Sequence, residues 1–257
     1  MELARLTVTQ ENGYAVAFID NPPVNALSQS VLRDLNSFVD ACLEDHAVKA
    51  LVITGAGTKF FSAGADISEF PAMQAGQTPR MSGHDVFWKI ESFPKPVIAA
   101  IQGSAYGGGT ELAMSCHLRI LSASAQVGLP EVRLGIIPGW GGTQRLPRLI
   151  GLTKALELML TGDSLTAEEA LRYGLVNKVV AAEAVLAEAK GLAARLAQGA
   201  PLAMREILKA VIRGRDVPID EGIKIEQAGS AAVFASEDAR EGVKAFFEKR
   251  TPVFRGR

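Results

Sequence analysis

Short apolar runs rich in β-branched residues recur through the first 180 residues of the chain, and their alternating or continuous pattern predicts β-strands. Polar and glycine-containing segments separate them. The predicted strands lie at Leu6–Thr9, Tyr14–Ile19, Ala50–Thr54, Pro96–Ile101, Leu118–Leu121 and, more briefly, Val176–Val180.

Helical spacing occupies the intervals between these strands. After Ser28, a suitable N-cap, the apolar residues recur at the spacing of one buried helix face. They are Val31, Leu32, Leu35, Phe38, Val39, Cys42 and Leu43. Alternating strands and helices predict an α/β fold with largely parallel pairing.

The pattern changes near residue 181, where strand signals stop. Segments around 183–198, 201–213, 219–235 and 237–248 have helical spacing. No repeat of fixed period or long flexible linker follows, so we expect this helical end to pack on the α/β body or on another subunit.

The charge balance argues against nucleic acid as the main ligand. Among 257 residues, 27 Lys and Arg face 28 Asp and Glu, which gives a net charge of -1, whereas phosphate backbones require a concentrated cationic surface. Cys42, Cys116 and three histidines show no disulfide framework and no metal-ligand spacing. Because we find neither a secretory h-region nor an apolar run long enough for a membrane span, we expect a cytoplasmic protein.

Two loops of small residues are candidates for binding a negative charge. One covers Gly103–Gly109 and is followed by helical composition at Thr110–Cys116, and the other is FFSAGADI at 60–67. Glycines allow close backbone approach, and amides at a helix start favour anions. One N–H from each loop would suit a carbonyl oxygen that becomes negative during a reaction, although tight strand–helix packing alone is an alternative. Dinucleotide and P-loop motifs are missing, which argues against an NAD-dependent oxidoreductase.

Two carboxylates in apolar contexts are candidates for acid–base chemistry. Glu111 follows the glycine loop closely, and Glu131 lies in QVGLPEVRLG. Burial would raise the pKa of one carboxyl toward working pH. Glu111 alone would also fit a helix-dipole role, and spacing does not show that the two residues meet.

The C-terminal residues 244–257 carry five basic side chains against one acidic side chain, Glu248, a local net charge of +4. This segment is either a solvated terminus or a contact for an anion.

Taken together, the motifs resemble those of an enoyl-CoA hydratase of the crotonase superfamily. The similarity extends over almost the whole chain, in the order found in the family. The matching segments are NPPVNALS at 21–28, FSAGADI at 61–67, GSAYGGGTELAMSCHLRI at 103–120, GLPEVRLGIIPGWGGTQRLPRLIG at 128–151, LTGDSLTAEEALRYGLVNKVV at 160–180 and SEDAREGVKAFFEKR at 236–250.

The resemblance implies a role for specific residues. Backbone N–H groups of Ala65 and Gly108 would form the oxyanion hole, and Glu111 and Glu131 would be the catalytic carboxylates. The coenzyme A site would include Val24, Ala26, Ala63, Asp66, Ile67 and, from a neighbouring subunit, Lys249. Ser68 stands where many hydratases have a lysine, and the variable segment Phe70–Trp88 would shape the acyl pocket.

The implied reaction is reversible addition of water to a trans-2-enoyl-CoA, giving a 3-hydroxyacyl-CoA in fatty acid β-oxidation or related acyl-CoA degradation. No metal or other cofactor is implied, because coenzyme A is part of the substrate. Glu111 would help activate water at Cβ and Glu131 would deliver a proton to Cα, with the division of the proton transfers left open. An enoyl-CoA isomerase, or another acyl-CoA enzyme of the superfamily, is the alternative.

The resemblance also implies a fold and an assembly. We expect a crotonase-like spiral of repeated ββα units at 1–195 and a C-terminal helical trimerisation region at 196–257. The expected partners are an acyl-CoA thioester and further copies of the chain, as a trimer or a dimer of trimers, and neither nucleic acid nor a membrane.

Overall fold

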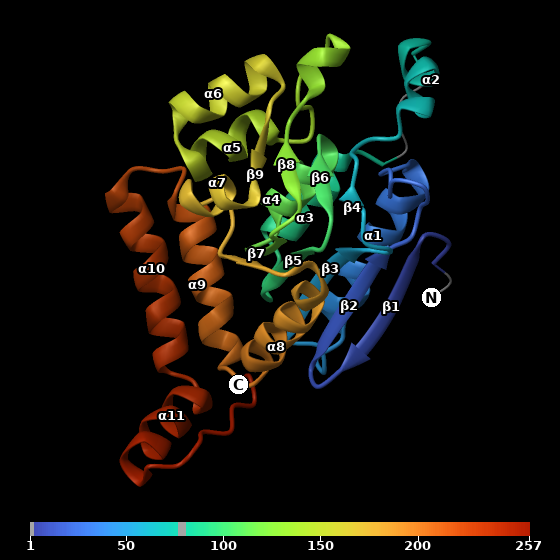
Figure 1. The fold of residues 1–257 in the computed structure, drawn as a ribbon. Coiled ribbons are helices and arrows are strands. Elements are labelled where there is room, and N and C mark those ends of the chain that lie inside the picture. Colours follow the sequence, from blue (N-terminus) through green and yellow to red (C-terminus); the bar gives the residue numbers. More distant parts are fainter. Residues whose placement is uncertain (1–2, 77–80) are drawn as a thin grey trace.

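The computed structural model describes residues 3–76 and 81–257, and its strands divide between two sheets (Figure 1). In the larger sheet β1 and β2 pair antiparallel, and the other neighbours pair in parallel. Its order is β1 (Leu6–Glu11), β2 (Tyr14–Ile19), β3 (Ala50–Gly55), β5 (Val97–Ile101), β7 (Leu118–Ser122) and β10 (Lys178–Val180).

The smaller sheet is built from strands of three residues. Neighbours β4, β6 and β8 pair in parallel, and β9 joins β8 antiparallel. The order is β4 (Phe60–Ser62), β6 (Ser104–Tyr106), β8 (Gln126–Gly128) and β9 (Ser164–Thr166).

From β3 to β8, consecutive strands alternate between the two sheets. In the pairs β3–β4, β5–β6 and β7–β8 the first strand joins the larger sheet and the second joins the smaller one. Helix α4 (Gly108–Ser115) follows the second pair, and α5 (Gly142–Ile150) follows the third pair. These are the repeated ββα units expected, and the predicted α/β class is confirmed.

Burial on both faces explains the apolar strands of the larger sheet. In β3, Leu51 and Ile53 belong to the main core, while Val52 faces the second apolar cluster beneath helix α8 (Val185–Ala197). Helix α1 (Gln29–Glu44) packs into the main core and begins where predicted, with the Ser28 hydroxyl accepting a hydrogen bond from the amide of Val31.

The shorter elements complete the α/β body. The predicted strands are all present, but the expected loop at Gly103–Gly109 contains β6, and α4 begins at Gly108 instead of Thr110. Three-residue strands give no readable periodicity, which explains the error. The remaining elements are η1 (Ile67–Glu69), α2 (Phe70–Gln74), α3 (Gly83–Glu91), η2 (Glu131–Leu134), α6 (Leu152–Thr161), α7 (Ala167–Arg172) and η3 (Ala182–Ala184).

The C-terminal helices extend from this body. Helices α9 (Pro201–Gly214) and α10 (Ile219–Phe234) pack side by side, and α11 (Glu237–Glu248) follows at the far end (Figure 1). The predicted domain boundary between residues 195 and 196 falls in the last turn of α8, and it stays a prediction. Among the described residues, no helix has the length and apolarity to cross a bilayer.

Candidate active site

A cavity of about 470 Å³ lies at the carboxyl ends of three neighbouring parallel strands of the smaller sheet. Ala65 follows β4, Gly108 follows β6 and Glu131 follows β8, and all three line the cavity. Adjacent strands lie about 4.8 Å apart. The sheet therefore brings together three loops, of which the outer two are 66 positions apart in the sequence.

The two predicted oxyanion amides lie on loops that approach very closely. A Cβ atom placed on Gly64 would lie 3.1 Å from the Gly108 nitrogen, and one placed on Gly108 would lie 3.2 Å from the Ala65 nitrogen. Among the described residues, neither amide donates a hydrogen bond to the protein, and Gly108 is the first residue of its helix. Both donors are thus available to an oxygen in the cavity.

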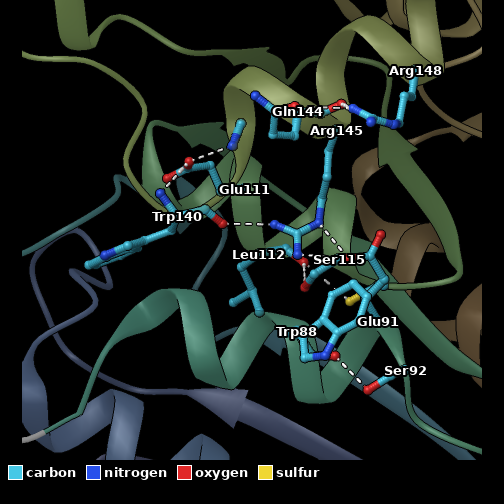
Figure 2. Close-up of polar contacts among 12 residues, drawn as sticks. Trp88, Glu91, Ser92, Glu111, Leu112, Ser115, Trp140, Gln144, Arg145 and Arg148 are labelled. Atoms are coloured by element: carbon cyan, nitrogen blue, oxygen red, sulfur yellow. Dashed lines mark hydrogen bonds and ion pairs between the residues drawn. The ribbon is translucent and has the colours of Figure 1, made fainter. Parts of the chain in front are cut away.

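Glu111 is buried, with 2% of its surface exposed, in the first turn of α4. Its Oε1 accepts hydrogen bonds from the amides of Trp140 (2.8 Å) and Gly142 (2.7 Å), at the start of α5 (Figure 2). Burial raises the pKa of this carboxyl, while the two amides and the Arg145 charge act in the opposite direction. The Glu111 carboxylate is therefore bound by amides at the start of α5, and it does more than interact with the dipole of α4, the helix that carries it.

Glu131 begins η2, where one carboxylate oxygen lies against the backbone of Gly107. Its Oε2 is buried and has no hydrogen-bond partner among the described residues. Loss of hydration raises the pKa of Glu131 from 4.5 to about 7, and the charge of Glu111 adds to this rise. Such a group exchanges a proton near neutral pH.

The residues predicted to contact coenzyme A are divided between the cavity and its surroundings. Ala63, Asp66 and Ile67 line the cavity, and Ile67 is 63% exposed at its edge. Asp66 accepts hydrogen bonds from the amide and the hydroxyl of Ser68. At the position where many hydratases have a lysine, the serine therefore stabilises the turn after Asp66. The variable segment also lines the cavity through Phe70 and other residues, while its positions 77–80 lie outside the described residues.

Val24, Ala26 and Lys249 are not among the residues described as lining the cavity. The Val24 carbonyl accepts a hydrogen bond from the amide of Ala63, so its segment supports the 63–65 loop from behind. Lys249 is the C-cap of α11, a helix that lies far from strands β4, β6 and β8 of the same chain (Figure 1). Its predicted role therefore depends on a neighbouring subunit.

His117 has a structural role. Its Nδ1 accepts a hydrogen bond from the Val97 amide, and Nε2 contacts the Glu91 carbonyl. Burial lowers the pKa of His117 to about 4, so the ring is neutral at physiological pH.

The sequence interpretation missed the groups that hold Glu111. The turn of residues 139–142, GWGG, precedes a helix in the same way as the two glycine-rich loops that were recognised. This is the signal that would have indicated an anion-binding turn. Arg145 and Glu91, which lie behind this turn, carry no comparable signal in the sequence.

Residues 9–257 match the family model described as enoyl-CoA hydratase/isomerase. The chain belongs to the enoyl-CoA hydratase/isomerase family. A probable enoyl-CoA hydratase of Bacillus subtilis is 46% identical over 94% of this chain and 95% of its own length. A crotonyl-CoA hydratase of Syntrophomonas wolfei is 44% identical over 99% of each chain. The crystal structure of an enoyl-CoA hydratase from Bacillus anthracis superposes with a TM-score of 0.92 at 37% identity, covering 98% of this chain and all of the other. The suspected family and its fold are confirmed.

Proposed function

We propose that this protein is an enoyl-CoA hydratase that adds water reversibly to a trans-2-enoyl-CoA. The observation that carries the proposal is the pair of carboxylates, the buried Glu111 and the partly buried Glu131, on one cavity that also exposes two amides without a partner among the described residues. Hydration needs an acid and a base for water and carbon, together with donors for the charge on the thioester oxygen.

The two amides would polarise the thioester carbonyl. The N–H groups of Ala65 and Gly108 converge from adjacent strands, and they stabilise the enolate-like oxygen that forms when water adds at Cβ. Main-chain donors at small residues leave room for the thioester to approach.

The carboxylates would divide the proton transfers as the implied mechanism suggests. Two amide hydrogen bonds favour the ionised form of Glu111, which takes a proton from water as the oxygen attacks Cβ. Glu131, with its raised pKa, delivers its proton to Cα. After one turnover the proton count of the pair is unchanged, because Glu111 has gained a proton from water and Glu131 has given one to Cα. No cofactor takes part, and coenzyme A belongs to the substrate.

Assembly and location extend the proposal. Helices α10 and α11 expose Phe234, Phe246 and Phe247, with exposed fractions of 82%, 79% and 78%. Aromatic surface of this extent supports association into a trimer or a dimer of trimers. We also propose a cytoplasmic location, where acyl-CoA thioesters would be available.

Substitution of each carboxylate tests the reaction. Glu111→Gln and Glu131→Gln should each lower kcat for crotonyl-CoA hydration by roughly 10²–10⁴-fold, while thioester binding is largely kept. Product identification by mass spectrometry should show a gain of one water, and a parallel assay with a 3-enoyl-CoA separates a hydratase from an isomerase. If either variant stays within a factor of two of the wild type, that glutamate is not catalytic.

A further inference from the structure

The position of Glu111 depends on a glycine-rich turn. Among the described residues, the two groups that donate to its carboxylate are both amides of the 139–142 turn. Three of the four residues in that turn are glycines, and Gly141 has a φ of 105°. Glycine gives the backbone wide conformational freedom, so the sequence of the turn does not itself fix the two amides.

Arg145 holds this turn from the side opposite the cavity. Its Nη1 donates to the Trp140 carbonyl at 2.7 Å, so the residue whose N–H binds Glu111 is bound at both of its backbone groups (Figure 2). A Cβ atom on Gly141 would overlap the Arg145 guanidinium. The absence of a side chain at position 141 is therefore what allows the guanidinium to lie beneath the turn.

Glu91 fixes Arg145 in turn. Arg145 donates from Nε (3.0 Å) and Nη2 (2.7 Å) to Glu91 Oε2, and the two residues are only 6% and 4% exposed. Arg215, after α9, donates to the other oxygen, Oε1. A buried ion pair gives little net stability compared with apolar residues of the same volume. The presence of the Glu91–Arg145 pair therefore needs an explanation other than stability.

We propose that the buried Glu91–Arg145 pair positions the catalytic carboxylate of Glu111 by fixing the backbone of Trp140. The inference rests on the hydratase function proposed above. Neither Glu91 nor Arg145 is among the described residues that line the cavity, so both act through another group and not on substrate. A shift of the Trp140 and Gly142 amides would move the Glu111 carboxylate away from the attacking water.

The test is a double-mutant cycle between Arg145→Gln and Glu111→Gln, measured with crotonyl-CoA. Arg145→Gln alone should lower kcat about 10–100-fold, the range expected for a displacement of about 1 Å of a catalytic group, with KM within about twofold of wild type. In the Glu111→Gln background the same substitution should change kcat less than about twofold, because the group that it positions is already missing. Equal factors in the two backgrounds, or no loss in the first, would overturn the proposal.

Arg215→Gln is the matched control, since it removes the other arginine from Glu91 without touching the Trp140 carbonyl. We expect kcat within about twofold of wild type, and a loss as large as that of Arg145→Gln would overturn the route through Trp140. If Arg145→Gln does not fold, Glu91→Gln replaces it in the cycle with the same expected non-additivity. A normal rate for Glu111→Gln alone would instead overturn the proposed acid–base mechanism, and with it this inference.

Discussion

Glu131 combines two properties at the scale of a single residue: a buried carboxylate oxygen with no partner among the described residues and a pKa of about 7. Both follow from its place on the cavity wall, where desolvation raises the pKa more than the hydrogen bond from its own backbone lowers it. A group of this kind gives the enzyme a proton at neutral pH, and it also makes the folded protein sensitive to pH.

Catalysis should fall as pH rises through about 7. The active form of the carboxylate pair carries one proton, and the folded pKa of Glu131 is raised, so the last proton is lost above that pH. Because the proton count of the pair does not change in a turnover, kcat/KM for hydration and for dehydration should share this limb. Measurement with crotonyl-CoA and 3-hydroxybutyryl-CoA between about pH 5.5 and 9 checks this.

In Glu131→Gln the residual activity should lack the limb near pH 7, because glutamine does not titrate. A wild-type profile that is flat across this range would contradict the assignment of the proton donor.

The stability of the folded protein should depend on pH in the same direction, because the protonated form of Glu131 is also the one that costs less to bury. The folded pKa of Glu131 is about 7 against 4.5 for the free group, so its contribution to the free energy of unfolding is present below pH 4.5 and is lost as pH rises through 7. Since the side chain is partly solvated, we expect Glu131→Gln to raise the free energy of unfolding at pH 8 by about 1–2 kcal/mol. Urea midpoints at pH 8 and pH 4.5 measure it, and an equal gain at both pH values would exclude ionisation as the cause.

The sequence located these residues but not their partners. Glycine-rich turns and the family resemblance were enough to indicate Ala65, Gly108, Glu111 and Glu131. The amides that bind Glu111 are 29 and 31 positions further along the chain. Such pairings are set by how α4 packs on α5, and local sequence does not encode them.

At the scale of elements, the loop after β4 and the loop after β6 have to touch for the proposed oxyanion hole to form. Gly64, with a φ of 103°, makes this contact: a Cβ there would lie 2.8 Å from the Tyr106 carbonyl oxygen and 3.1 Å from the Gly108 nitrogen. A side chain at this position would push the two amides apart.

Gly64→Ala should therefore lower kcat by about 10²–10³-fold, the effect of losing one oxyanion donor. Gly57→Ala is the matched control, because Gly57 also has a positive φ, of 76°, but has no atom within 4 Å of its Cβ position. Both substitutions carry the strain of the left-handed conformation, so the difference between them isolates the contact. The carbonyl stretch of a bound enoyl-CoA, measured by infrared spectroscopy, should move to lower frequency in wild type and less in Gly64→Ala. An equal loss of activity in both variants would mean that backbone strain alone is responsible.

The long strands of the larger sheet were predictable because burial on both faces gives continuous apolar runs, as in β3 and β5. The smaller sheet was not, since three residues such as Ser104–Tyr106 carry no periodicity. Its strand order was not predicted either, because parallel pairing joins strands separated by whole repeats.

At the scale of the whole molecule, the basic C-terminal segment is more neutral than its composition suggests. Arg250 pairs with Glu241 and Glu248, and Arg257 pairs with Glu237. Among the described side chains, Lys249 takes part in no ion pair, and it ends α11 in a left-handed conformation. The charge of Lys249, the predicted phosphate contact, is therefore not neutralised by an acidic side chain in the part of the chain that the structure describes.

Lys249→Gln should raise KM several-fold at low ionic strength, leave kcat nearly unchanged and have no effect with 3′-dephospho-coenzyme A thioesters. The reason is that an exposed contact with a phosphate is weak and screened by salt. Lys244→Gln, a substitution on the same exposed helix, is the control and should leave KM near the wild-type value. An equal penalty with both thioesters, or a fully active monomer in sedimentation, would contradict a role across subunits.

The order β4-β6-β8 has a consequence for specificity. The thioester oxygen would lie between the ends of β4 and β6, and the proton donor would lie at the end of β8. The distance between the oxyanion donors and the group that protonates Cα would therefore be set by the spacing of hydrogen-bonded strands. That spacing is common to every acyl chain, short or branched. The length of the acyl chain would instead affect contacts with Phe70, Met81, Ile136 and Ile137, which line the cavity outside the strands. The strand spacing would thus fix the distance between the reacting groups, while side chains outside the sheet would contact the acyl tail. Substitutions at those side chains could then change which acyl chains are accepted without moving the catalytic groups.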